Sequence, residues 1–131
     1  MKAYIIKFTI TTHGPMSYFP LRRIIEEYIE ETGLEKGLVT ISVKGATPGI
    51  IIADRSKLQS IDYAIKELVP VIGWKHGNAY AHLRSTIMST TQTIPFNNKR
   101  LVLPQSHQVY LVETRPVHNH RRTIVLYIRG R

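Results

Sequence analysis

The chain has 131 residues, of which 18 are Lys or Arg and 9 are Asp or Glu, so its formal net charge is +9. A hydrophobic fraction of 43% and a charged fraction of 21% indicate one folded domain and argue against a disordered chain. The absence of cysteine excludes disulfide bonds, thiolate metal sites and a cysteine nucleophile.

The positive charge is concentrated in the second half of the chain. Residues 1–67 contain nine basic and eight acidic residues, whereas residues 68–131 contain nine basic residues and a single acid, Glu113. This imbalance predicts an anionic partner, which could be a phosphorylated metabolite, a nucleic acid or a membrane surface. Residues 1–7 lack the apolar stretch of a signal peptide, and no apolar run reaches membrane-spanning length. We therefore expect a cytoplasmic protein with no membrane segment.

A strand followed by a helix is predicted at the start of the chain. Residues 4–12 alternate around β-branched types, which is typical of a strand, and Gly14-Pro15 ends it. Apolar side chains then recur with helical spacing over residues 21–29. The opposite face of this segment is charged, and Gly33 is a natural C-terminal stop.

Two short strands and a second helix are predicted next. The strands are expected at residues 38–43 and 50–52, separated by a loop. The helix should begin at Ser56, which has the spacing of a capping box with Gln59, and should end at Pro70.

The rest of the chain is expected to be mostly extended. Residues 79–88 fit either a short helix or a strand. A hairpin turn is predicted at Asn97-Asn98. Four further strands are expected, at residues 91–94, 101–103, 109–112 and 123–128. The order of these elements predicts one α+β domain in which antiparallel hairpins dominate the second half.

Residues 74–85 concentrate polar side chains that suit the binding of a phosphorylated small molecule. They include His76, Asn78, His82 and Arg84. An imidazole can transfer protons or bind a metal near neutral pH, and a guanidinium can form paired hydrogen bonds with phosphate oxygens. The alternative is a solvated loop with two incidental histidines, and their six-residue spacing matches no standard metal motif.

Two other places could also carry chemistry. The basic cluster at residues 118–122 could bind a phosphate or follow a nucleic-acid backbone, or it could be an ordinary exposed loop. Asp54 follows one predicted strand and precedes a helix. Its carboxylate could serve a metal ion or a proton transfer, or it could simply stabilise the N-terminus of that helix.

Four stretches carry a resemblance to a known family. Residues 37–43, Gly-Leu-Val-Thr-Ile-Ser-Val, are similar to a family pattern Gly-Leu-Val-Thr-Val-Phe-Val. Residues 78–85, Asn-Ala-Tyr-Ala-His-Leu-Arg-Ser, resemble Asn-Ala-Asp-Ala-His-Leu-Lys-Ala. Residues 93–103, Thr-Ile-Pro-Phe-Asn-Asn-Lys-Arg-Leu-Val-Leu, resemble Thr-Ile-Pro-Val-Glu-Asn-Gly-Arg-Leu-Val-Leu. The run ending in Arg121-Arg122 is similar to Pro-Arg-Arg-Arg-Arg. In this order and spacing the chain resembles the YjbQ-like family, also called the secondary thiamine-phosphate synthase family.

The resemblance implies an α+β fold, namely a single domain that is mainly an antiparallel β-sandwich with two α-helices, assembled as a homotrimer. It also implies a pocket near the histidine-containing segments that holds an anion or a divalent metal, Mg²⁺ or Zn²⁺. The activity that it implies is a weak thiamine-phosphate synthase reaction, which joins a pyrimidine diphosphate to a thiazole phosphate and releases pyrophosphate.

The chain departs from the family pattern at positions that could carry the chemistry. The histidine of the family's Val-Pro-His-Thr-Thr-Ala falls on Gly45, and its Asn-Glu carboxylate falls on Asp54. The Trp and Gln of Gly-Thr-Trp-Gln fall on Ser106 and His107, and Tyr80 replaces an aspartate. A site with one imidazole fewer would bind metal less well and would lack an acid–base group, unless His107 faces the same pocket.

Residue by residue, the resemblance predicts a combined site. His82 and Asp54 would be catalytic, and a metal would be held by His76, His82 and His107. Phosphate would be bound by polar and basic residues of these segments, namely Asn78, Arg84, Ser85, Arg121 and Arg122, because a diphosphate leaving group must have its charge neutralised. The leading hypothesis is a trimer that binds a phosphorylated small molecule and retains weak thiamine-phosphate synthase activity. The alternatives are a catalytically degenerate binding module of the same fold and a nucleic-acid-binding protein.

Overall fold

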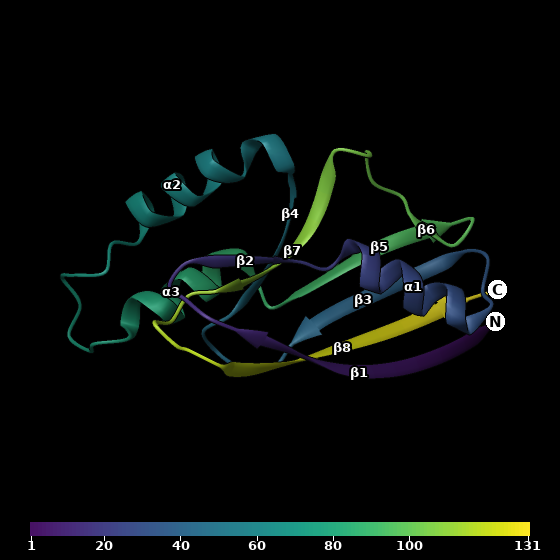
Figure 1. Cartoon of the computed structure of the whole chain (residues 1–131), viewed down its shortest axis with the longest axis horizontal. Helices are drawn as coiled ribbons and strands as arrows, with labels where there is room; N and C mark the ends of the chain where they lie inside the picture. The colour runs from purple at the N-terminus through teal and green to yellow at the C-terminus, as the bar shows by residue number, and fades with distance from the viewer.

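Two antiparallel sheets share the main hydrophobic core (Figure 1). The structure is a computed structural model that describes residues 1–131. The larger sheet has the strand order β1-β8-β3-β5-β6, with bounds Lys2–Thr12, His120–Gly130, Gly37–Val43, Thr91–Asn97 and Arg100–Leu101. The smaller sheet has the order β2-β7-β4, with bounds Ser17–Pro20, His107–Glu113 and Gly49–Asp54. All strand pairs are antiparallel, which confirms the predicted fold class.

Three α-helices accompany the sheets, where the resemblance implied two. They are α1 (Arg22–Thr32), α2 (Leu58–Leu68) and α3 (Ala79–Met88), so the segment that fitted either a helix or a strand is helical. Gly33 ends α1 in the left-handed conformation with φ +75°, as predicted from its position. None of the helices is long and apolar enough to cross a membrane.

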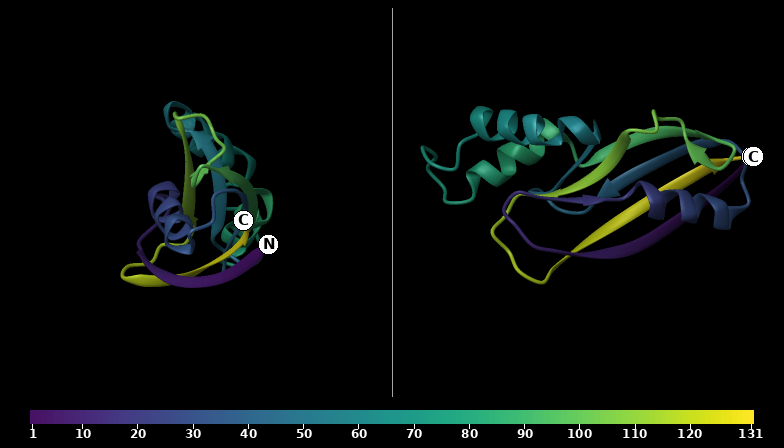
Figure 2. Two further views of the ribbon diagram at one scale, coloured as in Figure 1. Left: turned by 90° about the vertical axis from the view of Figure 1, so that its right-hand side faces the viewer. Right: turned by 45° about the horizontal axis from the view of Figure 1, so that its top comes forward.

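The larger sheet curls around α1, which packs its apolar face into the curl (Figure 2). The core between them includes Ile25 and Ile29 of α1, Phe96 of β5 and Leu126 of β8, all nearly or fully shielded from solvent. Leu111 of β7 brings the smaller sheet into the same core. The alternation of buried and exposed residues along β8 follows from the two-residue period of a strand with one buried face.

The helices α2 and α3 lie at the opposite end of the molecule from the two termini (Figure 1). They contribute Ile65 and Met88 to a second, smaller cluster with Tyr110 and Val112 of β7. The central strand of the smaller sheet therefore has apolar contacts on both of its faces, and six of its seven residues are buried.

Two local predictions are wrong in detail. Ser56 does not begin the second helix as a capping residue, because the Asp54 carboxylate accepts the Ser56 backbone N–H at 2.9 Å and starts a 3₁₀ turn over Arg55–Lys57. The hairpin turn lies one residue later than predicted, at Asn98 and Lys99, whose φ values are +52° and +65°. The strand β2 was not predicted.

Candidate functional site

The predicted site residues on α3 point to two different sides of the helix. His82 is exposed and lines a hollow of about 370 Å³ with Ser85, Thr86 and the loop residue Ala46. Residues three and four apart share one face of a helix, whereas a residue two positions away does not. Accordingly, Arg84 lines a different cavity. The structure brings His82 and Ser85 together but separates both from Arg84.

Arg84 is a buried cation, with 3% of its surface exposed. Its Nε donates a hydrogen bond to the carbonyl of Val69 at 3.0 Å. The guanidinium lies over the ring of Tyr80, 5.1 Å from the ring centre. Arg84 belongs to none of the five ion pairs of the structure.

Arg122 is also buried, but its charge is already neutralised. Its Nε and Nη2 donate to the two carboxylate oxygens of Glu113 at 2.8 and 2.7 Å, and Nη2 donates to Thr47 Oγ1 at 2.9 Å. Burial acts to raise the pKa of the Glu113 carboxyl, but the hydrogen bonds from Arg122 and Thr12 outweigh it and the pKa is lowered. Of the predicted arginine pair, only Arg121 is exposed.

Asp54 and His107 lie at the other end of the smaller sheet. They face each other in the pairing of β4 with β7, whereas the loop beside the His82 hollow joins β4 at Gly49, which faces Val112. The pair Asp54 and His107 is five residues along the strands from the pair Gly49 and Val112, which corresponds to roughly 17 Å. The structure therefore does not bring His107 to the hollow lined by His82.

The predicted metal ligands do not form a cluster. His76 lies in the segment of residues 71–78, each of which is exposed. The structure contains no group of three or more His, Cys, Asp or Glu residues that could hold a metal ion. The Asp54 carboxylate accepts hydrogen bonds from the backbone N–H and the hydroxyl of Ser56, which lower its pKa. Its observed contacts are those of a residue that begins a helical turn, the second of the two roles considered for it.

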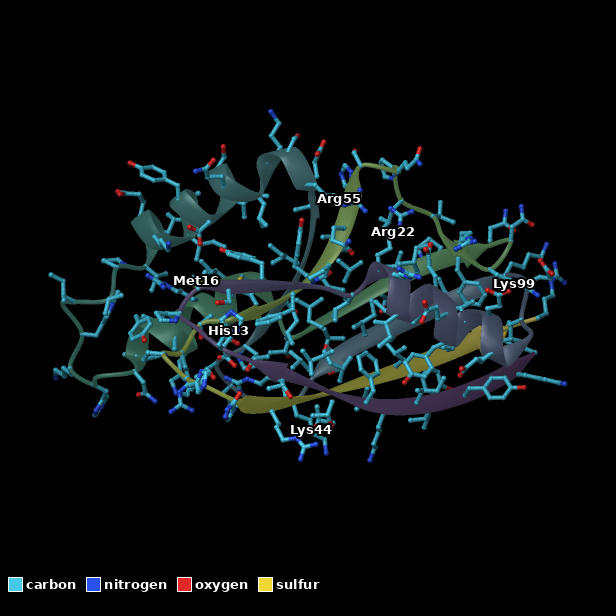
Figure 3. The ribbon with its side chains drawn as sticks, viewed as in Figure 1. His13, Met16, Arg22, Lys44, Arg55 and Lys99 are labelled. Atoms are coloured by element: carbon cyan, nitrogen blue, oxygen red, sulfur yellow. The ribbon has the colours of Figure 1, made fainter.

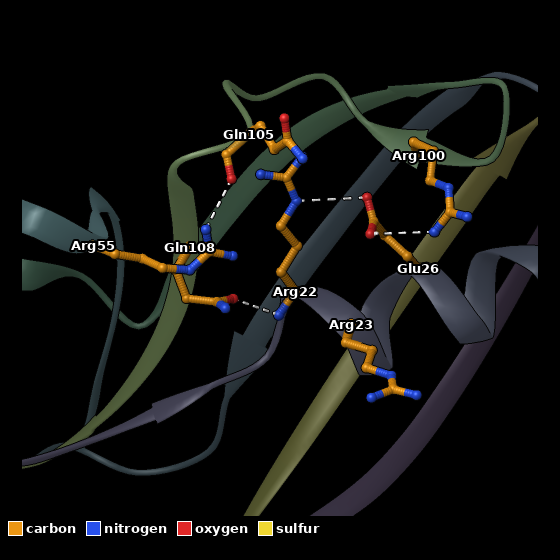
Figure 4. Close-up of a pocket in the computed structure, with 7 residues that line it drawn as sticks. All are labelled: Arg22, Arg23, Glu26, Arg55, Arg100, Gln105 and Gln108. Atoms are coloured by element: carbon orange, nitrogen blue, oxygen red, sulfur yellow. Dashed lines mark hydrogen bonds and ion pairs between the residues drawn. The ribbon is translucent and has the colours of Figure 1, made fainter.

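Sequence reasoning missed an arginine-rich cavity of about 340 Å³ (Figure 4). It has no hydrophobic lining residue and is formed by Arg22, Arg23, Glu26, Arg55, Arg100, Gln105 and Gln108. These residues come from four parts of the chain: α1, the turn after β4, β6, and β7 together with the segment that leads into it. Because the four segments are distant in sequence, no local motif could have revealed the cavity.

The loop that leads into β7 is held by two of these arginines, Arg22 and Arg55, which lie near each other on the upper edge of the molecule (Figure 3). Arg22 Nη1 donates to the carbonyls of Pro104 and His107 at 2.8 Å each. Arg55 Nη1 donates to the carbonyl of Gln105 at 2.9 Å. These hydrogen bonds fix the guanidinium groups in place without neutralising their charge.

The balance of charge in this cavity is strongly positive. Glu26 is the single carboxylate in the lining, and it is shared by Arg22 at 3.6 Å and Arg100 at 3.7 Å. Arg23 pairs with Glu27 outside the cavity at 3.2 Å. Even with Glu27 included, four guanidinium groups face two carboxylates.

The amide groups of the cavity add neutral donors. Gln108 Oε1 accepts the backbone N–H groups of Arg22 and Val109 at 2.8 and 3.0 Å, which leaves its Nε2 as the free end. The lining therefore combines fixed positive charge with hydrogen-bond donors, which is the chemistry that recognises phosphate oxygens.

Comparison with known proteins places the chain in a family. A family model described as UPF0047 protein YjbQ-like matches residues 6–131. The chain belongs to the YjbQ-like family. Among curated relatives of the family, a UPF0047 protein of Synechocystis is 28% identical over 81% of this chain and 78% of its own length. UPF0047 protein YugU of Bacillus subtilis is 26% identical over 71% of this chain and 76% of its own length.

Solved structures of similar proteins confirm the YjbQ-like fold. A YbjQ-like protein from Sulfolobus solfataricus, described as being of unknown function, has a TM-score of 0.89, 26% identity and 99% coverage of both chains. A hypothetical protein from Aeropyrum pernix has a TM-score of 0.85 and 27% identity, over 98% of this chain and 99% of its own. Membership of the YjbQ-like family thus gives the fold, and the function has to be argued from the site.

Proposed function

We propose that this YjbQ-like protein binds a phosphorylated small molecule in the arginine-rich cavity. The observation that carries the proposal is the excess of four arginines over one glutamate within a single polar cavity of about 340 Å³. That volume lies at the lower end of the range of small-molecule sites, so it suits a compact ligand. The proposal moves the phosphate site from the predicted residues around His82 to the region around Arg22 and Arg55.

Two of the predicted phosphate ligands are already engaged by other groups of the protein. Arg122 is paired with Glu113, and the Ser85 hydroxyl donates to the Pro48 carbonyl at 2.7 Å. By contrast, Arg55 and Arg100 are exposed at the cavity and keep unpaired N–H groups for a ligand.

Calorimetric titration with inorganic pyrophosphate tests this proposal. The double variant Arg55→Gln/Arg100→Gln should weaken binding about tenfold or more, because two charge-assisted contacts are lost. Arg129→Gln, which removes an exposed arginine on β8, is the matched control and should bind like the wild type. Equal affinity of the double variant and the wild type would overturn the proposal. Tighter binding of a single-stranded oligonucleotide than of pyrophosphate would favour a nucleic-acid-binding protein instead.

A second candidate function is a residual thiamine-phosphate synthase reaction at the hollow lined by His82. It is favoured by the position of His82 beside the loop residue Ala46, next to the position where the family pattern has a histidine. Turnover by the purified protein with Mg²⁺ that is lost in His82→Ala supports it, and absence of turnover removes it. The homotrimer implied by the family resemblance stays a prediction, which light scattering after size-exclusion chromatography tests.

A further inference from the structure

The cavity that Arg84 lines combines one buried cation with apolar walls. It has a volume of about 350 Å³ and lies between the loop before β2, the C-terminal end of α2 and the helix α3. Its lining consists of Pro15, Met16, Lys66, Pro70, Val71 and Arg84. Met16 lies at the end of the molecule where α2 and α3 are found (Figure 3).

Arg84 is held rigidly and has donors to spare. The hydrogen bond from Nε to the Val69 carbonyl and the contact with the face of Tyr80 fix the plane of the guanidinium. The N–H groups on Nη1 and Nη2 have no hydrogen-bond partner within the protein. They reach the solvent of the cavity, because the structure leaves no buried side-chain nitrogen without a partner. No carboxylate lies within ion-pair distance of Arg84, so its charge has no counter-charge within the protein.

The remaining charges near the cavity compensate one another. Lys66 pairs with Asp62 at 2.8 Å, and Asp62 also accepts the hydroxyl of Tyr18 at 2.6 Å. Burial, followed by that hydrogen bond, raises the pKa of Tyr18, so the phenol stays neutral. The group that faces the cavity without compensation is therefore the single positive charge of Arg84.

We propose that this cavity is a second binding site, for a small organic anion that carries one carboxylate on an apolar body. The free edge formed by Nη1 and Nη2 of the guanidinium matches the two oxygens of a carboxylate. Pro15, Met16 and Val71 would contact the apolar part. A phosphate dianion would bring two negative charges to one uncompensated cation, so it fits less well. The site is separate from the arginine-rich cavity and does not depend on the function proposed for it.

Trp74, the only tryptophan, provides a probe of this site. Its Nε1 donates to the carbonyl of Pro70 at 2.6 Å, and Pro70 is part of the cavity wall. Titration with butyrate should change the Trp74 emission in a saturable manner, whereas neutral butyramide should not. Inorganic phosphate should bind more weakly than butyrate. In Arg84→Met the butyrate affinity should fall at least about tenfold.

Two variants at position 71 test the proposal even if Arg84→Met does not fold. Val71→Glu places a carboxylate in the cavity wall, where it can pair with Arg84, and should abolish butyrate binding and raise the thermal midpoint. Val71→Gln, the uncharged isostere, should do neither. The proposal is overturned if butyrate leaves the wild-type emission unchanged, if butyramide or phosphate binds as well as butyrate, or if the two Val71 variants behave alike.

Discussion

Arg122 and Glu113 form a buried ion pair with two hydrogen bonds, of 2.8 and 2.7 Å, one to each carboxylate oxygen. The two side chains are 7% and 0% exposed. The pair joins β7 to β8, and its other hydrogen bonds reach Thr12 at the end of β1 and Thr47 in the loop before β4. One pair thus connects both sheets to the loop that borders the His82 hollow.

Removing one partner of this pair should destabilise the protein strongly. Arg122→Met leaves the Glu113 carboxylate buried without its counter-charge, and we expect the free energy of unfolding to fall by about 3–5 kcal/mol. Arg23→Met is the matched control, since Arg23 and its partner Glu27 are 94% and 62% exposed. The control should change stability by less than about 1 kcal/mol. Urea unfolding followed by circular dichroism measures both, and similar losses in the two variants would contradict the expectation.

The same pair should make stability depend on pH in the acid range. The pKa of Glu113 in the folded protein lies below its ordinary value of 4.5, so folding is favoured by the ionised form. This contribution is complete above pH 4.5 and is lost as the pH falls towards the folded-state pKa, by up to about 1.4 kcal/mol per pH unit. The stability difference between the wild type and Glu113→Gln should therefore be constant from pH 7 to pH 5 and shrink below it. A difference that stays constant to pH 3 would contradict this assignment.

Restoring the family histidine at position 45 should not restore a site. Gly45 has φ +122°, and a Cβ there would lie 3.1 Å from Arg122 Nη1 and 3.1 Å from Pro48 Cδ. We expect Gly45→His to destabilise the protein by about 1–3 kcal/mol, because residues that carry a Cβ rarely adopt this backbone conformation. Ala46→His is the control, since Ala46 does not have a positive φ and lines the hollow with His82. Thermal unfolding should show a lower midpoint for Gly45→His alone.

The regular elements could be predicted from the sequence because their apolar periods are local. The sequence fits either a helix or a strand over α3, because Arg84 and Ser85 are buried and these polar residues interrupt the apolar face that indicates a helix. The strand β2 owes its conformation to pairing with β7, which no four-residue pattern can show.

The site was harder to predict than the fold because it depends on register and on long-range contacts. Asp54 and His107 are 53 positions apart in sequence and face each other, whereas His82 and Arg84 are two positions apart and line different cavities. Residue type alone also could not distinguish Arg122, which has a buried carboxylate partner, from Arg84, which has none.

The turn between β5 and β6 offers a stabilising substitution. Asn98 and Lys99 both have positive φ, the conformation of a two-residue hairpin turn in which asparagine followed by glycine is preferred. Lys99→Gly should raise the free energy of unfolding by about 1 kcal/mol, because it removes the Cβ from a left-handed position. The hydrogen bond from the Lys99 backbone N–H to the Glu35 carbonyl, at 3.0 Å, does not depend on the side chain. Lys99→Ala removes the same charge but keeps the Cβ, so it should leave the urea midpoint nearly unchanged. Equal stabilisation by both variants would attribute the gain to the lost charge and contradict the backbone explanation.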